Sequence, residues 1–549
     1  MNYFLAIIFI LVSWFLISKL LKKRRLHKFR KELLENWGKE KKKKYYNFFV
    51  ISKYFNNNSH EKKAYHLISE KTKIDLDINE VFKFIDRTSS KIGEQYLYFK
   101  LRTIGTVDKL LEFNSLTSIF QRNKELSISY QLELSKLNNN NSYYLEELIN
   151  GKQLEKPKYI QLILALTLTG ITSIVFSFFN PIFGLALIPI LAINLVFHYK
   201  NKHSVTYYLN GVTQLSKALK VSEKLTKNRE ITSYFRDISF IKRIQSIKFK
   251  TEFIAFEKNV NNEFLFAFWF VAEIIKILFN IEYLMFYSFM KSIKKEQKSI
   301  EDMFLFIGEI DAAISTASLK SGSLKICTPK FNNNYNLNIE EIEHPLIENC
   351  IENSVNFHNK SMLLTGSNMS GKTTFIRTVA VNSILAQTLN ICFAKSYNAP
   401  FYKVFSSIRI SDDLLDNTSY YLQEVLTIKE LIDASTDKNP CLFILDEIFK
   451  GTNTIERISG GKAILSHLNR KQHTVLVSTH DIELTDLLQK EDYNLYHFSE
   501  LIKDNELIFD HKIKKGKLKT RNAIKILDLY DYPKTIIKDA KEIEKNYFS

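Results

Sequence analysis

A glycine-rich loop, Gly366 to Thr373, lies between an apolar run and a helical pattern and restricts the fold of the chain around it. Its sequence GSNMSGKT fits the pattern GxxxxGK(S/T). The run Ser361 to Thr365 before it predicts a short strand. Glycines in such a loop let successive backbone N–H groups point at phosphate oxygens, and the next helix adds its positive end. The order of strand, loop and helix therefore predicts an α/β domain that binds nucleotide phosphates.

Two further apolar runs end in polar residues, as strands beside such a loop do. Cys441 to Leu445 precedes Asp446 and Glu447, and Val475 to Ser478 precedes Thr479-His480. We expect Asp446 to hold Mg²⁺, usually through water, and Glu447 to polarise the attacking water. We expect His480 to sense the γ phosphate or to orient that water. The alternative for His480 is a structural histidine with satisfied hydrogen bonds.

The loop itself supplies the remaining roles. Lys372 is expected to reach the β and γ phosphates of ATP, and Thr373 to ligate Mg²⁺. The predicted catalytic residues are therefore Lys372, Glu447 and His480, and the predicted metal ligands are Thr373 and Asp446. From about residue 337 onward, short apolar runs alternate with helical patterns, which predicts a mainly parallel sheet. The sequence Ser459-Gly460-Gly461-Lys462 superficially resembles a transporter ATPase signature, but it follows the acidic strand, and we interpret it as coincidence.

The first apolar segment, Tyr3 to Leu21, is nearly uncharged and long enough to cross a bilayer as a helix. A cleaved signal peptide is the alternative, and it would have positive charge before the apolar run and small residues after it. Here the basic run 22–25 follows instead. We therefore expect an uncleaved anchor whose C-terminal side is cytoplasmic.

Residues 159–198 contain no Asp, Glu, Lys or Arg, and Asn180-Pro181 at their centre is a turn signal. Two membrane helices of about twenty residues fit this length, and lysines on both flanks predict cytoplasmic ends. A buried hairpin in a globular domain is the alternative. A third stretch, Phe264 to Met290, includes Glu273, Lys276 and Glu282. Because ionisable groups are costly at membrane depth, we expect it to form a pair of buried helices outside the membrane.

The location of the positive charge matters more than the net value of +18. Residues 19–44 hold thirteen Lys or Arg and three Glu. Their net charge of 13 − 3 = +10 is more than half of the net charge of the chain. Anionic cytoplasmic lipid attracts such a juxtamembrane segment. Basic residues also bind DNA phosphates, so DNA is the alternative partner of this cluster. The net charge is therefore weak support for nucleic-acid binding.

Ordered motifs from about His344 to Ala540 resemble the ATPase domain of MutS, the DNA mismatch-repair ATPases. The loop GSNMSGKTT is similar to that family's GPNMxGKST, including the Asn368-Met369 pair. The other similar elements are His344-Pro345, Ser419 to Glu424, Leu445 to Thr454, Ser478 to His480, His497-Phe498, Asn522-Ala523 and Tyr532-Pro533. Ile74 to Arg102 and Ile307 to Ser318 look, more weakly, like parts of the helical core that precedes that domain.

The resemblance implies a homodimer with composite sites and DNA as the ligand. Ser419 would reach the γ phosphate bound by the partner subunit, and residues Gly451 to Thr454 would cross the interface. Helices after Tyr532 would strengthen pairing. The residues that the resemblance and the loop together assign to ATP are Gly366, Ser367, Asn368, Met369, Ser370, Gly371, Lys372, Thr373, Thr374 and Ser419.

The chain also departs from the family's pattern. The mismatch-reading domain of MutS carries a Phe-x-Glu wedge near its N-terminus, and no Phe before the P-loop here is followed two positions later by Glu. Ser367 replaces the proline of the loop, and Phe449-Lys450 replaces the usual pair before Gly451. We therefore expect the ATPase, but not mismatch recognition, to be retained.

The predicted organisation is an α/β P-loop NTPase domain preceded by a mostly helical region with transmembrane helices. Its parts are an anchor over 1–21, a basic juxtamembrane and core-like region over 22–158, a membrane hairpin over 159–199, a lever-like helical region over 200–330, and a MutS-type ATPase domain with dimerisation helices over 331–549.

The predicted function is a dimeric ATPase in the cell membrane, with about three spans and a cytoplasmic ATPase domain, that couples ATP and Mg²⁺ to DNA. The alternative is an ATP-dependent assembly module for a protein or lipid partner. A transporter subunit is disfavoured, because spans without charge offer no substrate path.

Overall fold

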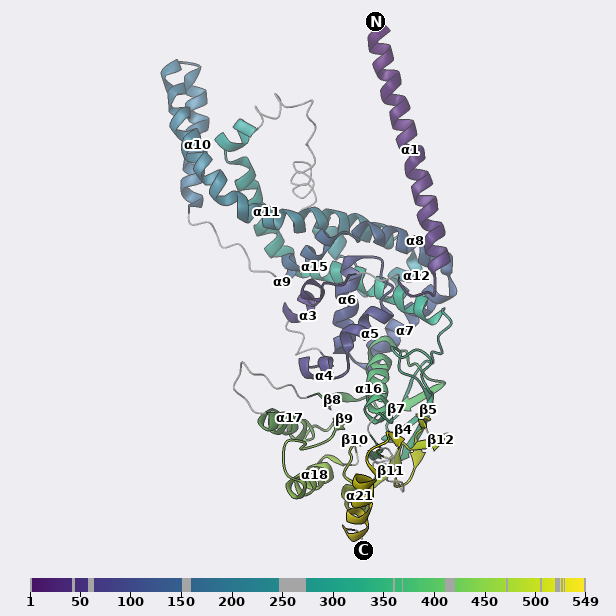
Figure 1. The fold of residues 1–549 in the computed structure, drawn as a ribbon. Coiled ribbons are helices and arrows are strands. Elements are labelled where there is room, and N and C mark those ends of the chain that lie inside the picture. The colour runs from purple at the N-terminus through teal and green to yellow at the C-terminus, as the bar shows by residue number, and fades with distance from the viewer. Residues whose placement is uncertain are drawn as a thin grey trace. The chain divides into compact units, whose positions relative to one another are not determined.

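The computed structural model comprises two compact units that are built from interleaved stretches of the chain (Figure 1). The first unit comprises Met1–Ser59, Asp86–Phe99 and Ser115–Gly322, and the second comprises His60–Ile85, Lys100–Asn114 and Ser323–Ser549. The structure describes residues 2–41, 45–57, 64–150, 159–245, 273–358, 361–367, 369–409, 420–470, 472–503, 506–518, 524, 527 and 529–547.

Helices form the described part of the first unit. They are α1 (Asn2–Asn36), α2 (Phe48–Ile51), α3 (Lys53–Asn57), α8 (Lys124–Leu134), η2 (Ser135–Leu137), η3 (Asn140–Tyr144), α9 (Leu145–Asn150), α10 (Ile160–Ser177), η4 (Pro181–Ala186), α11 (Leu187–Leu225), α12 (Arg229–Thr232) and α15 (Ile281–Lys320), with α6 (Lys91–Arg102) and α7 (Val107–Arg122) shared between the units. α1 is a continuous helix that includes both the apolar run and the basic residues after it. Its Arg30 forms an ion pair with Glu125 of α8.

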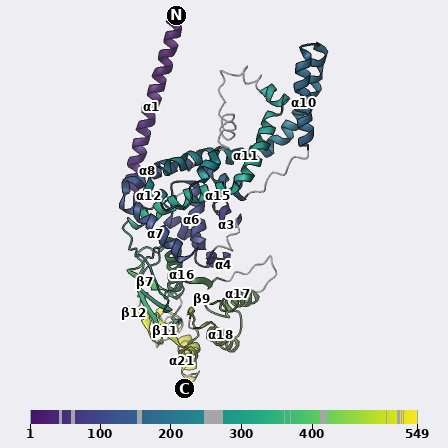
Figure 2. The ribbon, with the colours of Figure 1, turned by 180° about the vertical axis from the view of Figure 1, so that it is seen from behind.

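The apolar segment 159–198 forms the helices α10 and α11, which lie side by side in both views (Figures 1 and 2). Asn180 caps the turn by accepting a hydrogen bond from the backbone N–H of Ile182 at 3.0 Å. Pro181 is the first residue of η4, a position at which a backbone N–H would have no partner within the helix. The predicted pair of helices is confirmed, but α11 continues beyond the apolar part to Leu225. Within the described residues, two segments are long and apolar enough to cross a membrane, Ile160–Ser177 and Pro181–Tyr199.

Of the third apolar stretch, residues 264–272 lie outside the described part of the chain, so the predicted helix pair is only partly visible. Residues 273–278 are helical, and α15 begins at Ile281 after Asn280, which adopts a left-handed conformation with φ of 48°. α15 continues to Lys320 and includes the predicted core piece Ile307 to Ser318.

Glycines allow α6 and α15 to cross closely in the core of the first unit. A Cβ atom at Gly93 would lie 2.1 Å from Oδ2 of Asp311, and one at Gly308 would lie 2.4 Å from Cβ of Tyr96. Asp311 is fully buried and accepts hydrogen bonds from the backbone N–H groups of Ser89 and Ser90, both at 2.8 Å, so it caps the start of α6. Burial raises the pKa of Asp311 to about 6.

The second unit contains a mainly parallel sheet, as the sequence predicts. Its strand order among the described residues is β14-β11-β6-β10-β9-β8, with only β14 antiparallel to its neighbour. The strands are β6 (Ser361–Thr365), β8 (Lys403–Ser407), β9 (Cys441–Asp446), β10 (Thr474–Ser478), β11 (Tyr493–His497) and β14 (Lys514–Lys515). β6, β9 and β10 coincide closely with the three predicted strands.

Helices and smaller sheets complete this unit. The helices are α4 (Glu70–Asp75), α5 (Ile78–Ile85), α16 (Lys372–Leu389), α17 (Tyr420–Ala434), α18 (Thr454–Leu468), α19 (Ile482–Gln489) and α21 (Lys534–Tyr547). A second sheet has the order β3-β7-β4-β5 and is made of β3 (Lys330–Phe331), β7 (Ser396–Ala399), β4 (Asn336–Ile342) and β5 (Asn353–His358). Two further pairs of strands are β1 (His66–Leu67) with β2 (Thr103–Ile104), and β12 (Glu500–Lys503) with β13 (Glu506–Phe509).

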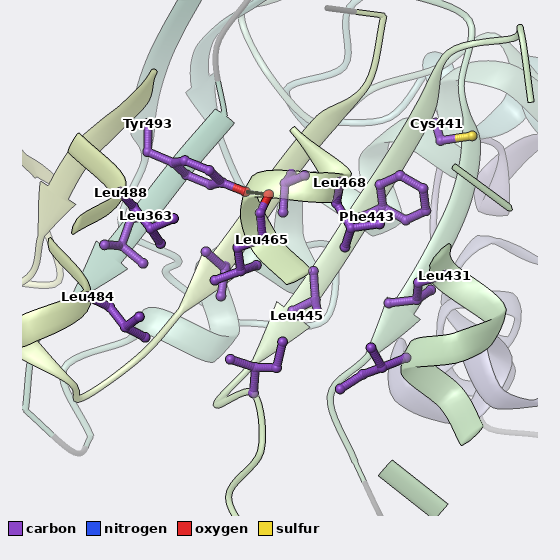
Figure 3. Close-up of a cluster of buried hydrophobic side chains, with 14 residues drawn as sticks. Leu363, Leu431, Cys441, Phe443, Leu445, Leu465, Leu468, Leu484, Leu488 and Tyr493 are labelled. Atoms are coloured by element: carbon purple, nitrogen blue, oxygen red, sulfur yellow. Dashed lines mark hydrogen bonds between the residues drawn. The ribbon is translucent and has the colours of Figure 1, made fainter. Parts of the chain in front are cut away.

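Buried apolar residues hold α17, α18 and α19 on the sheet (Figure 3). Alternate strand residues such as Phe443 and Leu445 belong to this cluster, together with Leu465 of α18 and Leu484 of α19. Each buried side chain of this size contributes about 1.5–3 kcal/mol. The cluster also holds Tyr493, whose hydroxyl donates to the carbonyl oxygen of Leu465 at 2.8 Å. This packing fixes the strands whose ends form the site described next.

Candidate nucleotide-binding site

Three parallel strands bring the predicted site residues to one edge of the sheet. Ser478 of β10 lies opposite Leu364 of β6 on one side and opposite Asp446 of β9 on the other. Because parallel strands end at the same edge, the loops after these strands start next to one another. The P-loop, Glu447 and Thr479-His480 therefore meet although they lie up to about 110 residues apart in sequence.

The P-loop adopts backbone conformations that require glycine. Gly366 and Gly371 have φ of 152° and 110°, in the region that disfavours side chains. A Cβ atom at Gly366 would also lie 2.8 Å from Oγ of Ser370 and 2.9 Å from the carbonyl oxygen of Phe498. α16 begins directly after Gly371, so its first N–H groups face the loop. These features fit a cradle for phosphate groups.

Lys372 lies in this cradle with its charge partly desolvated. Its Nζ donates to the carbonyl oxygens of Gly366 and Ser367, both at 2.8 Å, and lies 3.3 Å from Nε2 of His480. Burial lowers the pKa of Lys372, and the nearby acids Asp446 and Glu447 oppose this shift. A triphosphate would supply stronger anionic partners for the ammonium than these carbonyl oxygens do.

The two predicted metal ligands lie together. Oγ1 of Thr373 donates to Oδ2 of Asp446 at 2.7 Å, and the hydroxyl of Ser478 donates to the other oxygen of the same carboxylate. Hydroxyl and carboxylate oxygens are the ligands that Mg²⁺ takes beside nucleotide phosphates. The residues present therefore fit Mg²⁺.

Glu447 lies between the side chains of Lys450, which is cationic, and His480, which is cationic when protonated. Its Oε1 lies 2.9 Å from Nε2 of His480, and its Oε2 lies 2.7 Å from Nζ of Lys450. The hydrogen bond from His480 lowers the pKa of Glu447 to about 2, against the opposing effect of burial and with a further contribution from Lys450. The lowered pKa keeps Glu447 ionised near neutral pH, as its predicted role toward the attacking water requires.

Glu424, within the predicted Ser419 to Glu424 element, positions the loop that follows Glu447. Its carboxylate is buried and accepts hydrogen bonds from the backbone N–H groups of Phe449 and of Lys450, the latter at 3.3 Å. Burial raises the pKa of Glu424, and these N–H groups oppose that shift. The loop needs such support because Glu447 and Phe449 have φ of 52° and 58°.

We expect Glu424→Ala to lower ATP turnover on the order of 10- to 100-fold, because the freed loop would misplace Glu447. Leaving the two N–H groups unpaired also costs about 1–3 kcal/mol of stability. Steady-state ATPase assays and thermal unfolding would measure both effects. Glu430→Ala, on the exposed face of the same helix, is the matched control. Equal turnover in the two variants would contradict this role.

A cavity of about 440 Å³ opens beside the P-loop. Lys372, Thr373, Glu447 and His480 line it, as do Ser367, Met369, Gly371 and Thr374. Its other lining residues include the apolar Ile342, Ile347, Ile351 and Phe498 and the polar Asn353 and His511. One end of the cavity is thus formed by the P-loop and the other by a less polar wall.

Sequence reasoning missed most of this wall. Nδ1 of His511 lies 3.0 Å from the carbonyl oxygen of Ser370, and Asn353 donates to the carbonyl oxygen of His511 at 3.0 Å. Asn353 also accepts a hydrogen bond from the backbone N–H of Ile513 at 2.8 Å, which ties this segment to the edge of β5. A lone histidine 140 residues after the P-loop carries no motif that could have indicated this position.

A second missed feature is an acidic turn between α4 and α5 that contacts the ends of β8 and α16. Asp75 is fully buried and accepts hydrogen bonds from the hydroxyl of Ser406 at 2.8 Å and from the backbone N–H of Arg409 at 2.9 Å. Asp77 pairs with Arg409 at 2.7 Å and with Arg377 at 3.4 Å. Arg377 lies one helical turn after Thr373, so this turn supports the start of the P-loop helix.

Two positions that depart from the resembled pattern have structural partners. The hydroxyl of Ser367 donates to Oε2 of Glu500 at 2.7 Å. Gly460 and Gly461, of the sequence that resembles a transporter signature, lie within α18. A Cβ atom at Gly460 would lie 2.8 Å from the ring of Phe449, so this glycine permits close packing of α18 on the loop after Glu447.

Of the predicted site residues, Asn368 and Ser419 lie outside the described part of the chain, as do Asn522 and Ala523. The structure brings together the remaining ones, which are Gly366, Ser367, Met369, Ser370, Gly371, Lys372, Thr373, Thr374, Asp446, Glu447 and His480. Their roles stay predictions.

The sequence model of MutS domain V matches residues 362–547. The DNA mismatch repair protein MutS of Aquifex pyrophilus is 31% identical over 276 residues, which cover 48% of this chain and 32% of that protein. The DNA mismatch repair protein MutS of Staphylococcus aureus (strain JH9) is 30% identical over 274 residues, which cover 48% of this chain and 31% of that protein. The matched part therefore spans about a third of the length of these curated relatives.

Proposed function

The chain belongs to the MutS family through its domain V, and we propose that it is an ATPase held at a membrane. The observation that carries the proposal is the meeting of Lys372, Thr373, Asp446, Glu447 and His480 around one cavity. The function follows from the chemistry that these side chains share rather than from the names of the relatives.

Each residue has a distinct task in the proposed reaction. Lys372 and the N–H groups of the P-loop bind the β and γ phosphates of ATP. Thr373 and Asp446 hold Mg²⁺, which supplies neutralisation of the phosphate charge when it is bound. Glu447 orients the attacking water and accepts its proton, and His480 holds the carboxylate in place. The apolar wall around Ile347 and Ile351 accommodates the base of the nucleotide.

The membrane part of the proposal rests on exposed apolar side chains. Leu168, Phe178 and Phe179 of the hairpin are 63%, 85% and 84% exposed, and Trp14 of α1 is 69% exposed. Apolar patches of this extent are rare on proteins that contact only water. Insertion of α10, the first part of α11 and the first part of α1 into lipid would cover them. The basic part of α1 would then lie against anionic headgroups.

We further propose a homodimer that couples ATP to DNA; the name of the relatives, DNA mismatch repair protein, supports DNA as the ligand. Met369 at the tip of the P-loop and Ile455 at the start of α18 are 83% and 79% exposed, which suits burial against a second copy. The second candidate function is an ATP-dependent assembly module whose client is a protein or lipid. The apolar hairpin favours it, because the hairpin brings the chain to the membrane.

The full chain in lipid nanodiscs, assayed for ATPase with and without duplex, mismatched or branched DNA, tests these proposals. We expect hydrolysis that depends on Mg²⁺. Stimulation by DNA, with binding that weakens as salt rises, would support DNA as the client. An unchanged rate and no binding near physiological salt would favour the assembly module. A protein that binds no ATP and hydrolyses none would contradict the proposed ATPase.

A further inference from the structure

The turn between residues 273–278 and α15 packs against the apolar hairpin. Nδ2 of Asn194 on α11 donates to the carbonyl oxygen of Leu278 at 2.7 Å. Oγ1 of Thr167 on α10 lies 3.3 Å from the carbonyl oxygen of Phe279, and 2.8 Å from that of Ile163 in its own helix. One polar side chain from each hairpin helix thus faces a carbonyl group of this turn.

These contacts satisfy groups that a broken helix leaves free. The carbonyl groups in the last turn of a helix have no partner within the helix, and the left-handed Asn280 ends the segment at this point. In water, solvent would satisfy these oxygens. In hydrocarbon no solvent is present, so irregular backbone is tolerated only where protein groups supply the hydrogen bonds. Asn194 is fully buried within a segment that lacks charged residues. Its side-chain amide supplies the hydrogen bond that the carbonyl oxygen of Leu278 needs.

We propose that this turn lies inside the bilayer, so that residues 273–290 form a further membrane-embedded element, seated on the hairpin and surrounded by lipid acyl chains. The inference rests on the membrane insertion of α10 and α11 proposed above. It replaces the expectation that the stretch Phe264 to Met290 is a pair of buried helices outside the membrane.

The lengths of the two helices agree with this depth. Thr167 lies eight residues after Tyr159, where the apolar segment begins, which is about 12 Å along a helix. Lys291, the first lysine of α15, lies ten residues after Ile281, which is about 15 Å. The turn would therefore lie about 12–15 Å below the membrane surface, within one half of a hydrocarbon core of about 30 Å. Lys291, Lys294 and Lys295 would then reach the headgroups.

Two of the three charged residues that argue against membrane depth, Glu273 and Lys276, form an ion pair, and the third, Glu282 at the start of α15, has a side chain outside the described part of the structure. Nζ of Lys276 lies 2.7 Å from Oε2 of Glu273, and both side chains are about four-fifths buried. Ionisable groups in membrane segments pair with one another in this manner. An apolar cavity of about 400 Å³ opens beside the turn and is lined by Thr167, Ile171, Phe279, Ile281 and Leu284. Its lining suits an acyl chain.

Lipid photolabelling of the unmodified chain tests the proposal. The chain is reconstituted in nanodiscs that contain a phospholipid with a diazirine on its acyl chain, and labelled peptides are identified by mass spectrometry. We expect labelling in 273–290 as well as in 160–199, and at least tenfold less in 300–320. Labelling of 160–199 without 273–290 would overturn this inference alone. Labelling of neither segment would overturn the membrane proposal itself.

A variant tests the docking contact. Asn194→Leu removes the donor to Leu278, and we expect amide hydrogen exchange in residues 278–284 to rise on the order of tenfold. Thr169→Val is the matched control, because Thr169 is exposed and its hydroxyl donates to the carbonyl oxygen of Ala165 in its own helix. Equal exchange in Asn194→Leu and in the unmodified chain would contradict docking through Asn194.

Discussion

Glu447→Gln is expected to lower ATP turnover roughly 10²- to 10⁴-fold while ATP binding is retained. The substitution keeps the shape of the side chain and a hydrogen-bond acceptor for His480, but removes the negative charge that we propose accepts a proton from the attacking water. Because the pKa of Glu447 is lowered to about 2, the native carboxylate is ionised throughout the assay range, and the loss should be the same from pH 6 to 9. Single-turnover kinetics with bound nucleotide would separate binding from hydrolysis.

Glu491→Gln is the matched control for this change. Glu491 makes an ion pair with Lys462 at 2.7 Å and lies at the opposite end of α19 from His480. Surface ion pairs contribute about 0–1 kcal/mol, so turnover should stay within about twofold of the unmodified protein. Full turnover by Glu447→Gln would remove the proposed role of Glu447 and point to another base.

Gly308→Ala is expected to have the largest effect on stability. A methyl group at this position would lie 2.4 Å from both Cβ and Cγ of Tyr96, which belong to the rigid base of that side chain. Overpacking of this kind costs about 1–3 kcal/mol or more, which exceeds the gain of up to about 1 kcal/mol when alanine replaces glycine in a helix. Faster hydrogen exchange in peptides of α6 and α15 and earlier thermal unfolding would report the loss.

Gly105→Ala provides the comparison for this prediction. The nearest atom that a Cβ at Gly105 would meet is Cδ of Lys109, at 3.9 Å, which is ordinary van der Waals contact. A stability equal to or slightly above that of the unmodified protein is expected there. If Gly308→Ala matched Gly105→Ala, then the close crossing of α6 and α15 would not be a constraint on the core.

The P-loop part of the site could be predicted because its chemistry is local. The loop must contain glycine where φ is positive, and Lys372 and Thr373 follow it at fixed spacing, so one short segment specifies a strand, a cradle and a helix. Asp446 and His480 could be predicted because apolar strands that end in polar residues place those residues at one sheet edge. The sequence also indicated the hairpin, since few structures other than a pair of apolar helices accommodate forty consecutive residues that include no Asp, Glu, Lys or Arg.

The remaining features depend on contacts between residues far apart in sequence. No local pattern could place His511 against the carbonyl of Ser370, Asp75 at the end of β8, or Asn194 against Leu278. Each of these contacts joins one polar group to a backbone group that lies 84 to 334 residues away. Such pairings carry no periodicity, because one side chain satisfies one exposed N–H or carbonyl group, and only the packed fold decides which group is exposed.

The sequence by itself thus determined a glycine-rich P-loop, the acids beside it and apolar helices, because period, charge and glycine spacing act over short distances. Tertiary structure alone decided how Glu424 holds the loop of Glu447, where α11 ends, and that a broken helix meets the hairpin at Asn280. The physical reason is the cost of a buried polar group without a partner, which depends on the complete set of neighbours.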